Sequence, residues 1–187
     1  IPPLFAIAMQ EGAIDSLDDP VGRYLPEWSD DPRGAITIKQ FLYNLSGLEN
    51  PPLAKDPNPD NKSTRLALGG DFRTAALAFE LENTPGDYFA LSNANAEIVA
   101  AVLETATGES YESYFNSRLW GPIGAGPAFF SMAPNDGMPP VYCSFRATPR
   151  AWLRLCAALL HTAPLARSPS SPHGLHSPMH PAEDSYP

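Results

Sequence analysis

Several acidic side chains stand close enough together in the sequence to suggest acid–base chemistry. Asp18 and Asp19 form an adjacent pair of carboxylates, the group that many hydrolases use to transfer protons. Pro20 follows them and predicts the first turn of a short helix, where acidic side chains bind free backbone N–H groups. We therefore predict that this pair caps a helix and has no catalytic role.

A second acidic group lies in a segment rich in proline and asparagine. Asp56, Asn58 and Asp60 alternate as the ligands of a calcium-binding loop do. The segment lacks the central glycine and the final glutamate of such a loop. The prediction for this segment is a solvent-exposed turn without a metal.

Histidine is the side chain that most often binds metals or takes up protons near neutral pH. All four histidines lie near the end of the chain: His161, His173, His176 and His180. Residues 1–160 contain no histidine and no Gly-x-Ser-x-Gly sequence, which excludes a Ser-His-Asp triad there. Proline and serine dominate residues 161–187, so this tail is not expected to pack. Without a packed frame to fix ligand geometry, we predict only adventitious metal binding, with no metal site and no cofactor.

Two explanations of this tail remain open. It is either a disordered or metal-binding linker, or it is not native sequence. The abrupt change in composition after the apolar run at 152–160 favours the second explanation. Under both, residues 1–160 form the partial domain and residues 161–187 lie outside it.

The elements that would position a site are predicted to be mostly helical. Apolar residues at helical spacing indicate helices over 93–107, ended by Gly108, and over 149–160. Thr37 and Gln40 stand at the spacing of a capping box and mark another helix start. Further helices are expected over 3–12, 72–81 and 111–119, loops over 49–63 and 121–140, and one short strand over 141–145.

Composition limits the class of protein. The chain has 187 residues, of which 43% are hydrophobic and 18% charged, as in an ordinary globular domain. A net charge of −9 with scattered basic residues argues against a nucleic-acid partner. No apolar run reaches the roughly 18 residues of a membrane span. Cys143 and Cys156 are expected to be unpaired. The sequence does not distinguish between a cytoplasmic and a periplasmic location.

Four blocks, in order, carry a resemblance to a known family. They are LDDPVGRYLPEW (17–28), AITIKQFLYNLSGL (35–48), TPGDYFALSNANAEIVAAVLETATG (84–108) and FRATPRAWLRL (145–155). Together they resemble the serine hydrolases of the β-lactamase-related superfamily, in particular the class C β-lactamase, esterase and 6-aminohexanoate-dimer hydrolase group. The resemblance implies the helical lobe of an α+β fold, with most of the β-sheet missing from this chain.

The same resemblance implies a catalytic set that this chain does not supply. Family members use a Ser-x-x-Lys nucleophile motif, a Tyr that carries protons, and a late strand with a Lys or His motif. None of the three lysines, Lys39, Lys55 and Lys62, has a serine three residues before it. The family motif would lie just upstream of Ile1. The late strand is absent, and residues 161–187 stand in its place.

Three residues of the third block are the candidate site. The family's Tyr position falls on Leu91, which cannot transfer a proton. Asn93 matches the family's Asn, which implies a contact with the substrate amide, although a helix-capping role suits it as well. Tyr88 is the nearest phenol and is a second candidate for substrate binding.

These observations predict a fragment of a serine hydrolase that cleaves an amide or ester bond in a small molecule. Because it lacks the Ser-x-x-Lys motif, the chain as given is expected to be inactive. The alternative is a non-catalytic helical module that binds a partner through the cleft in which the family's enzymes bind their substrates.

Overall fold

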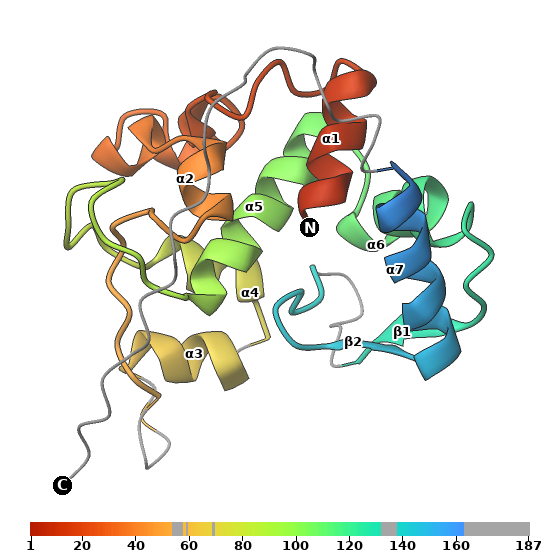
Figure 1. Ribbon diagram of the computed structural model, residues 1–187. Helices are drawn as coiled ribbons and strands as arrows, with labels where there is room; N and C mark the ends of the chain where they lie inside the picture. The colour runs from red at the N-terminus through yellow and green to blue at the C-terminus, as the bar shows by residue number, and fades with distance from the viewer. Residues whose placement is uncertain (54–57, 59, 69, 132–137, 163–187) are drawn as a thin grey trace, which may run out of the picture.

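The computed structural model describes residues 1–53, 58, 60–68, 70–131 and 138–162. These residues form several helices around a central one, with a small two-stranded sheet and the last helix to one side (Figure 1). The α-helices are α1 (Pro2–Gln10), α2 (Ile38–Leu42), α3 (Lys62–Leu68), α4 (Phe72–Leu77), α5 (Asn93–Thr107), α6 (Tyr111–Phe115) and α7 (Pro149–Thr162). The short 3-10 turns are η1 (Val21–Arg23), η2 (Pro26–Trp28) and η3 (Pro32–Ala35), and η4 (Asn116–Trp120) is a π-helical turn.

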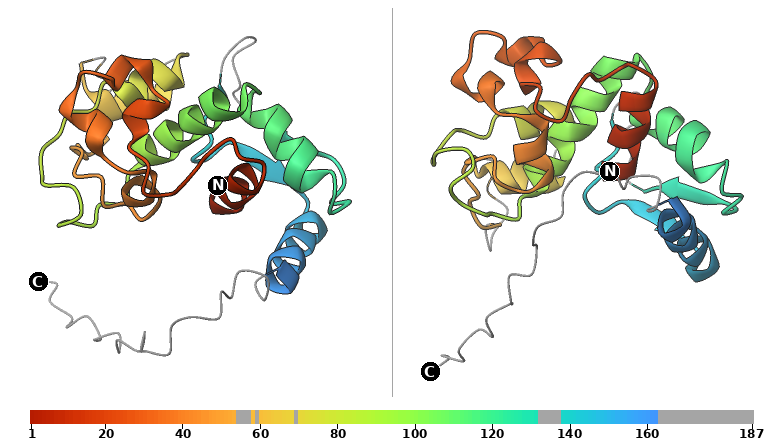
Figure 2. Two further views of the ribbon diagram at one scale, coloured as in Figure 1. Left: turned by 90° about the horizontal axis from the view of Figure 1, so that it is seen from above. Right: turned by 45° about the horizontal axis from the view of Figure 1, so that its top comes forward.

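The central helix α5 is the hydrophobic centre of the fold. Its apolar side chains Ile98, Val99, Val102 and Leu103 are all buried, as their helical spacing predicts. Gly108 ends the helix in the left-handed conformation, with φ of 69°. The helices α1, α2, α4 and α6 pack against α5, and Figure 2 shows them gathered around it.

Helix α2 begins at the predicted capping box. The Gln40 backbone N–H donates to Thr37 Oγ1 at 3.2 Å, and the Thr37 backbone N–H donates to Gln40 Oε1 at 2.9 Å. These two bonds satisfy N–H groups that a helix start leaves free. The helix is short, and the chain leaves it through Asn44 into the Leu-Ser-Gly turn.

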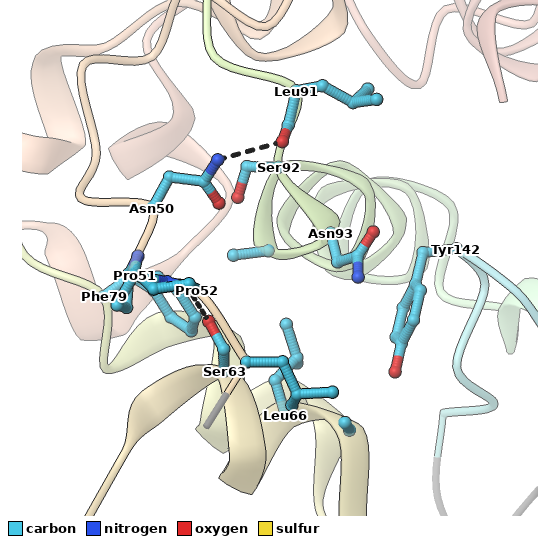
Figure 3. Close-up of a pocket in the computed structure, with 13 residues that line it drawn as sticks. Asn50, Pro51, Pro52, Ser63, Leu66, Phe79, Leu91, Ser92, Asn93 and Tyr142 are labelled. Carbon is cyan, nitrogen blue, oxygen red and sulfur yellow. Dashed lines mark hydrogen bonds between the residues drawn. The ribbon is translucent and has the colours of Figure 1, made fainter. Parts of the chain in front are cut away.

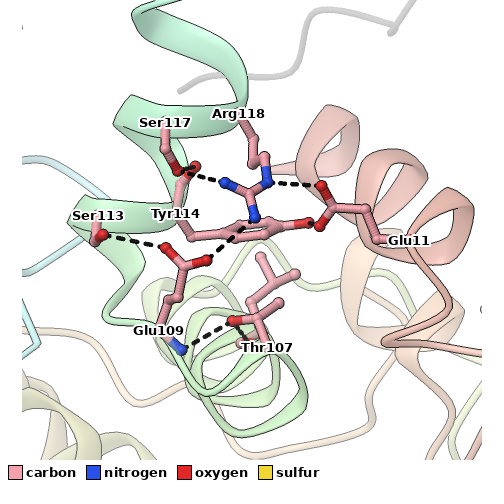
Figure 4. Close-up of polar contacts among 8 residues, drawn as sticks. Glu11, Thr107, Glu109, Ser113, Tyr114, Ser117 and Arg118 are labelled. Atoms are coloured by element: carbon pink, nitrogen blue, oxygen red, sulfur yellow. Dashed lines mark hydrogen bonds and ion pairs between the residues drawn. The ribbon is translucent and has the colours of Figure 1, made fainter.

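A polar cluster joins Glu11, the residue that follows α1, to α6 and η4 (Figure 4). Arg118 Nε donates to Glu11 Oε1 at 2.6 Å, and the Tyr114 hydroxyl donates to Glu11 Oε2 at 3.0 Å. The Arg118 guanidinium also lies over the Tyr114 ring and pairs with Glu109. More than a hundred residues separate Glu11 from Arg118, so these bonds fix where α1 sits in the fold.

Sheet and helix boundaries differ from the sequence-based expectations in five places. Helix α3 begins inside the predicted loop, α4 ends at Leu77 and not at 81, and η4 replaces the end of the helix predicted over 111–119. Strand β1 (Ala128–Phe130) lies in a predicted loop, and β2 (Phe145–Ala147) starts where the predicted strand ends. The two strands pair antiparallel with Phe130 opposite Phe145, inside a cluster of aromatic rings. Strands of three residues are too short for a periodic sequence signal.

The predicted fold class is confirmed: among the described residues the only strands are β1 and β2, and the rest of the regular structure is helical. None of the described helices is long and apolar enough to cross a membrane. Cys143 and Cys156 are exposed, free thiols. His173, His176 and His180, like the rest of residues 163–187, lie outside the described residues.

Candidate functional site

The amino end of α5 separates two cavities. The larger one, of about 430 Å³, is called the proline pocket here because Pro51 and Pro52 form part of its wall. The smaller one, of about 300 Å³, is called the α1 pocket because Ile1 and Pro2 line it. Four residues line both cavities: Leu91, Ser92, Asn93 and Tyr142.

The proline pocket is uncharged and has one polar side. Its apolar wall includes Pro51, Pro52, Leu66 and Phe79, from the loop before α3, from α3 itself and from the segment after α4. Its polar groups are the hydroxyls and amides of Asn50, Ser63, Ser92, Asn93 and Tyr142 (Figure 3). This combination of apolar walls with a few convergent polar groups is typical of small-molecule sites.

Asn44 holds the segment before α5 in place. It is the one described non-glycine residue with positive φ, 57°, a conformation that asparagine tolerates better than most side chains. Its Oδ1 accepts hydrogen bonds from Ser92 N at 3.3 Å and from Asn95 Nδ2 at 3.1 Å. Its carbonyl oxygen accepts from Ala90 N at 2.9 Å. The end of α2 thus fixes where residues 90–95 lie, a role that the sequence analysis missed.

A second buried contact supports this arrangement from inside the fold. The Ser46 hydroxyl donates to Asn95 Oδ1 at 2.8 Å, and both side chains are buried. Asn95 therefore has its carbonyl oxygen and its amide nitrogen both bound to the α2 side of the site. The only signal in the sequence is an asparagine followed by Leu-Ser-Gly after a capped helix, which predicts a turn but not its distant partners.

Leu91 lies at the surface of the site. Its side chain is 74% exposed and lines both cavities, while its carbonyl oxygen accepts from Asn50 Nδ2 at 3.1 Å. Leu91 is therefore not part of the buried core. The side chain presents hydrocarbon to the cavities and has no proton to transfer.

Asn93 and Tyr88 are placed differently. Asn93 is the first residue of α5, is exposed and lines both cavities, whereas the N-cap position belongs to Ser92. Tyr88 is 61% exposed and lines neither cavity. The phenol that does line them is Tyr142, which the sequence analysis did not single out. Figure 3 draws its ring next to Asn93, on the other side of the proline pocket from Pro51 and Pro52.

A buried carboxyl group lies behind Tyr142. Glu97, on α5, is 0% exposed, and its Oε1 accepts from the Tyr142 backbone N–H at 3.2 Å. Its Oε2 has no hydrogen-bond partner among the described residues. Burial raises the pKa of Glu97 to about 8, although the backbone N–H groups of Tyr142 and Val141 act in the opposite direction. The carboxyl is therefore mostly protonated at neutral pH.

Asp18 and Asp19 line neither of the two cavities. Asp19 does not cap η1, whose N-cap is Pro20, so the capping prediction was wrong in detail. Its Oδ2 instead accepts from the Tyr24 hydroxyl at 2.6 Å, and this bond lowers the pKa of Asp19. Asp18 is exposed and lies 3.7 Å from Lys39 Nζ. Asp56 lies outside the described residues, which contain no group of three or more potential metal ligands.

Comparison with known proteins identifies the family. The sequence matches the β-lactamase family over residues 4–170. The Flp protein of Staphylococcus aureus (strain MRSA252) is 31% identical over 117 residues, which are 61% of this chain and 22% of that protein. The structure is similar to that of a 6-aminohexanoate-dimer hydrolase from Bacillus anthracis, with a TM-score of 0.71 and 22% identity. That likeness covers 83% of this chain and 43% of the other.

A D-stereospecific amidohydrolase from Streptomyces is similar over 84% of this chain and 56% of its own, with a TM-score of 0.61 and 19% identity. At such identities the structural likeness shows the fold alone, and that fold is the one expected from the four sequence blocks. The match spans less than a quarter of the staphylococcal protein and about half of the two solved structures. Since the family match covers most of the chain, this protein belongs to the β-lactamase family of serine hydrolases.

Proposed function

We propose that this chain is the helical part of a serine hydrolase that cleaves an amide or ester bond in a small molecule, and that it is inactive alone. The substrate would lie at the amino end of α5. The observation that carries this proposal is that Ile1 and Pro2 line the α1 pocket together with Ser92 and Asn93. A Ser-x-x-Lys segment directly before Ile1 would therefore enter the same cavity.

Inactivity follows from the chemistry of the groups present. A serine hydroxyl needs a nearby base to become a nucleophile, and the leaving group needs a proton. Leu91 offers only hydrocarbon where a phenol would serve as proton carrier. Asn93 is free to bind a substrate amide, since it is exposed, lines both cavities and leaves the capping position to Ser92.

A non-catalytic binding module is the second candidate. Tyr88, Phe89 and Leu91 are all large and exposed, they lie within four positions of the chain, and Leu91 lines both cavities. Exposed apolar patches of this kind favour association with a partner. Under this alternative the pockets bind a partner side chain and no bond is cleaved.

The test compares the chain of 187 residues with an extended form that carries an upstream Ser-x-x-Lys segment and a late strand. The chain alone should not react stoichiometrically with a fluorophosphonate probe and should not hydrolyse p-nitrophenyl esters or 6-aminohexanoate dimer above background. The extended form should be labelled at the added serine. Labelling of a serine within residues 1–160 would contradict inactivity. An extended form that is folded but never labelled would favour the binding module.

A further inference from the structure

Glu97 is a buried carboxyl group that the proposed function leaves without a role. Its side chain is 0% exposed, its Oε1 accepts from the Tyr142 N–H at 3.2 Å, and its Oε2 has no hydrogen-bond partner among the described residues. An ionised carboxylate has about four sites that accept hydrogen bonds. The ionised form of Glu97 is therefore poorly solvated in this arrangement, whereas the neutral form loses much less on burial.

The Glu97 carboxyl group anchors residues 139–143, which we call the Tyr142 segment. The two prolines of this segment have no N–H to donate, and its last N–H closes a local turn on the Pro140 carbonyl oxygen at 3.4 Å. The N–H groups of Val141 and Tyr142 are left, and both interact with Glu97. In the part of the chain that the structure describes, Glu97 is thus the group outside the segment that receives hydrogen bonds from it.

The Tyr142 segment forms a wall that the two cavities share. Tyr142 lines both cavities, and Val141 lines the α1 pocket. Both residues are half-buried and Cys143 is exposed, so burial holds this half of the segment less firmly than it holds the two prolines, which are buried. A movement of these three residues would therefore change the walls of both cavities and let water reach Glu97.

The charged and titratable groups around Glu97 do not compensate its negative charge. Burial raises the pKa of Glu97, and the charge of Glu104 on the same helix raises it further. Burial also raises the pKa of Tyr111, on α6, and of Tyr142, and the charge of Glu97 adds to both shifts. The ion pairs of the described residues do not include Glu97.

The helices α1, α2 and α4 also pack against α5, but their charged groups are not among those that act on Glu97. The amino group of Ile1, a residue that lines the α1 pocket, titrates separately, because burial lowers its pKa to about 6. A pH experiment on the segment must therefore distinguish Glu97 from Ile1.

We propose that Glu97 is a proton-dependent anchor of the Tyr142 segment. With its proton, Glu97 stays buried and the segment forms the shared wall of the two cavities. When Glu97 releases its proton to water, the segment moves away, water solvates the carboxylate, and Tyr142 no longer lines the cavities. This inference does not depend on bond cleavage, so it stands or falls separately from the proposed function.

The experiment is amide hydrogen exchange of the isotope-labelled chain, followed by NMR between pH 6 and pH 8.5. The measured quantity is the protection of each amide, which is its intrinsic exchange rate divided by the observed rate. The protection of the Tyr142 amide should fall about tenfold over this range. Low concentrations of urea should leave it unchanged, because a local opening exposes little surface. The Val102 amide, inside α5, should respond to urea, since it exchanges through larger openings.

Matched variants assign the pH dependence to Glu97. In Glu97→Gln, which keeps the shape and cannot ionise, the protection of the Tyr142 amide should stay constant over the same pH range. Glu82→Gln, at an exposed carboxyl, is the control and should show the original fall. Both variants keep the Ile1 amino group, so its titration cannot explain a difference between them.

A second measurement needs no variant. The ¹³C signal of the Glu97 carboxyl in the original chain should titrate well above pH 4.5, and the side-chain signals of Leu91, which lines both cavities, should shift with the same midpoint. A midpoint near pH 4.5, or an equal fall of Tyr142 protection in Glu97→Gln, would overturn the proposal. The same urea dependence for the Tyr142 and Val102 amides would also overturn it, because Glu97 would then act on the whole fold and not on the segment.

Discussion

Glu97 should make the stability of this chain fall as pH rises, opposite to the usual effect of a carboxylate. Its side chain is 0% exposed, and burial raises its pKa from 4.5 to about 8. The folded state therefore keeps a proton that the unfolded state releases near pH 4.5. The contribution of Glu97 to the free energy of unfolding is fully present below pH 4.5. It declines as the pH rises from 4.5 to about 8 and is lost above that pH.

The magnitude follows from the size of the shift. Raising the pKa of Glu97 from 4.5 to about 8, at about 1.4 kcal/mol per unit, gives an upper limit of roughly 5 kcal/mol. The window from pH 5 to pH 8.5 covers about 4 kcal/mol of this limit. Local relaxation and water entry reduce the figure further, so we expect a loss of about 1–3 kcal/mol over that window. That is a large part of the roughly 5–15 kcal/mol that stabilises a typical domain.

Glu97→Gln tests this reasoning because glutamine has the same shape and cannot ionise. Its free energy of unfolding, measured by urea denaturation with circular dichroism, should stay nearly constant over the same pH range. At pH 8.5 the variant should therefore be more stable than the original chain. Glu82→Gln, at an exposed carboxyl, is the control and should keep the original pH dependence. Equal slopes for the original chain and Glu97→Gln would refute the assignment.

Three further predictions concern the site and the turns that hold it. In the extended form described above, Leu91→Tyr should raise the esterase rate by about 10²-fold or more, while Tyr88→Phe should leave it unchanged; the reverse result would make Tyr88 the proton carrier. Gly47→Ala should lower the unfolding free energy by about 2–4 kcal/mol, because its Cβ would stand 2.2 Å from the Asn83 carbonyl oxygen at φ of +72°. Gly12→Ala, with equally positive φ but nothing within 4 Å, should cost only about 1 kcal/mol in the same urea assay. Asn44→Gly keeps the positive φ but loses two accepted hydrogen bonds, so it should cost about 1–3 kcal/mol; an unchanged midpoint would show that Asn44 does not hold the site.

The elements that could be predicted from the sequence are those whose signals are local. The capping box of Thr37 and Gln40 and the left-handed Gly108 each act within four residues, and both occur as predicted. Strand β1 could not be predicted, because its three residues become a strand only by pairing with residues 145–147. Helix α3 follows a proline-rich loop and is too short for its apolar spacing to stand out.

The same distinction applies to the candidate site. Leu91 and Asn93 could be found because they belong to one continuous sequence block. Asn44 reaches the site through hydrogen bonds to residues 48 and 51 positions away, which no local pattern records. Tyr142 reaches it because the segment that follows Met138 folds back against Glu97, 45 positions earlier.

The groups proposed for ligand binding and those proposed for bond cleavage belong to different segments. Asn93, proposed to bind the substrate amide, is the first residue of α5. The buried apolar face of α5 and the hydrogen bonds of Asn44 fix the position of this helix. The groups proposed for bond cleavage, a Ser-x-x-Lys motif and a late strand, are not found among the described residues. Among the described residues, α1, α2, α4 and α6 all pack against α5, so these contacts do not depend on the groups proposed for bond cleavage. A chain that is folded but not labelled by fluorophosphonate is therefore the result that the proposed function requires.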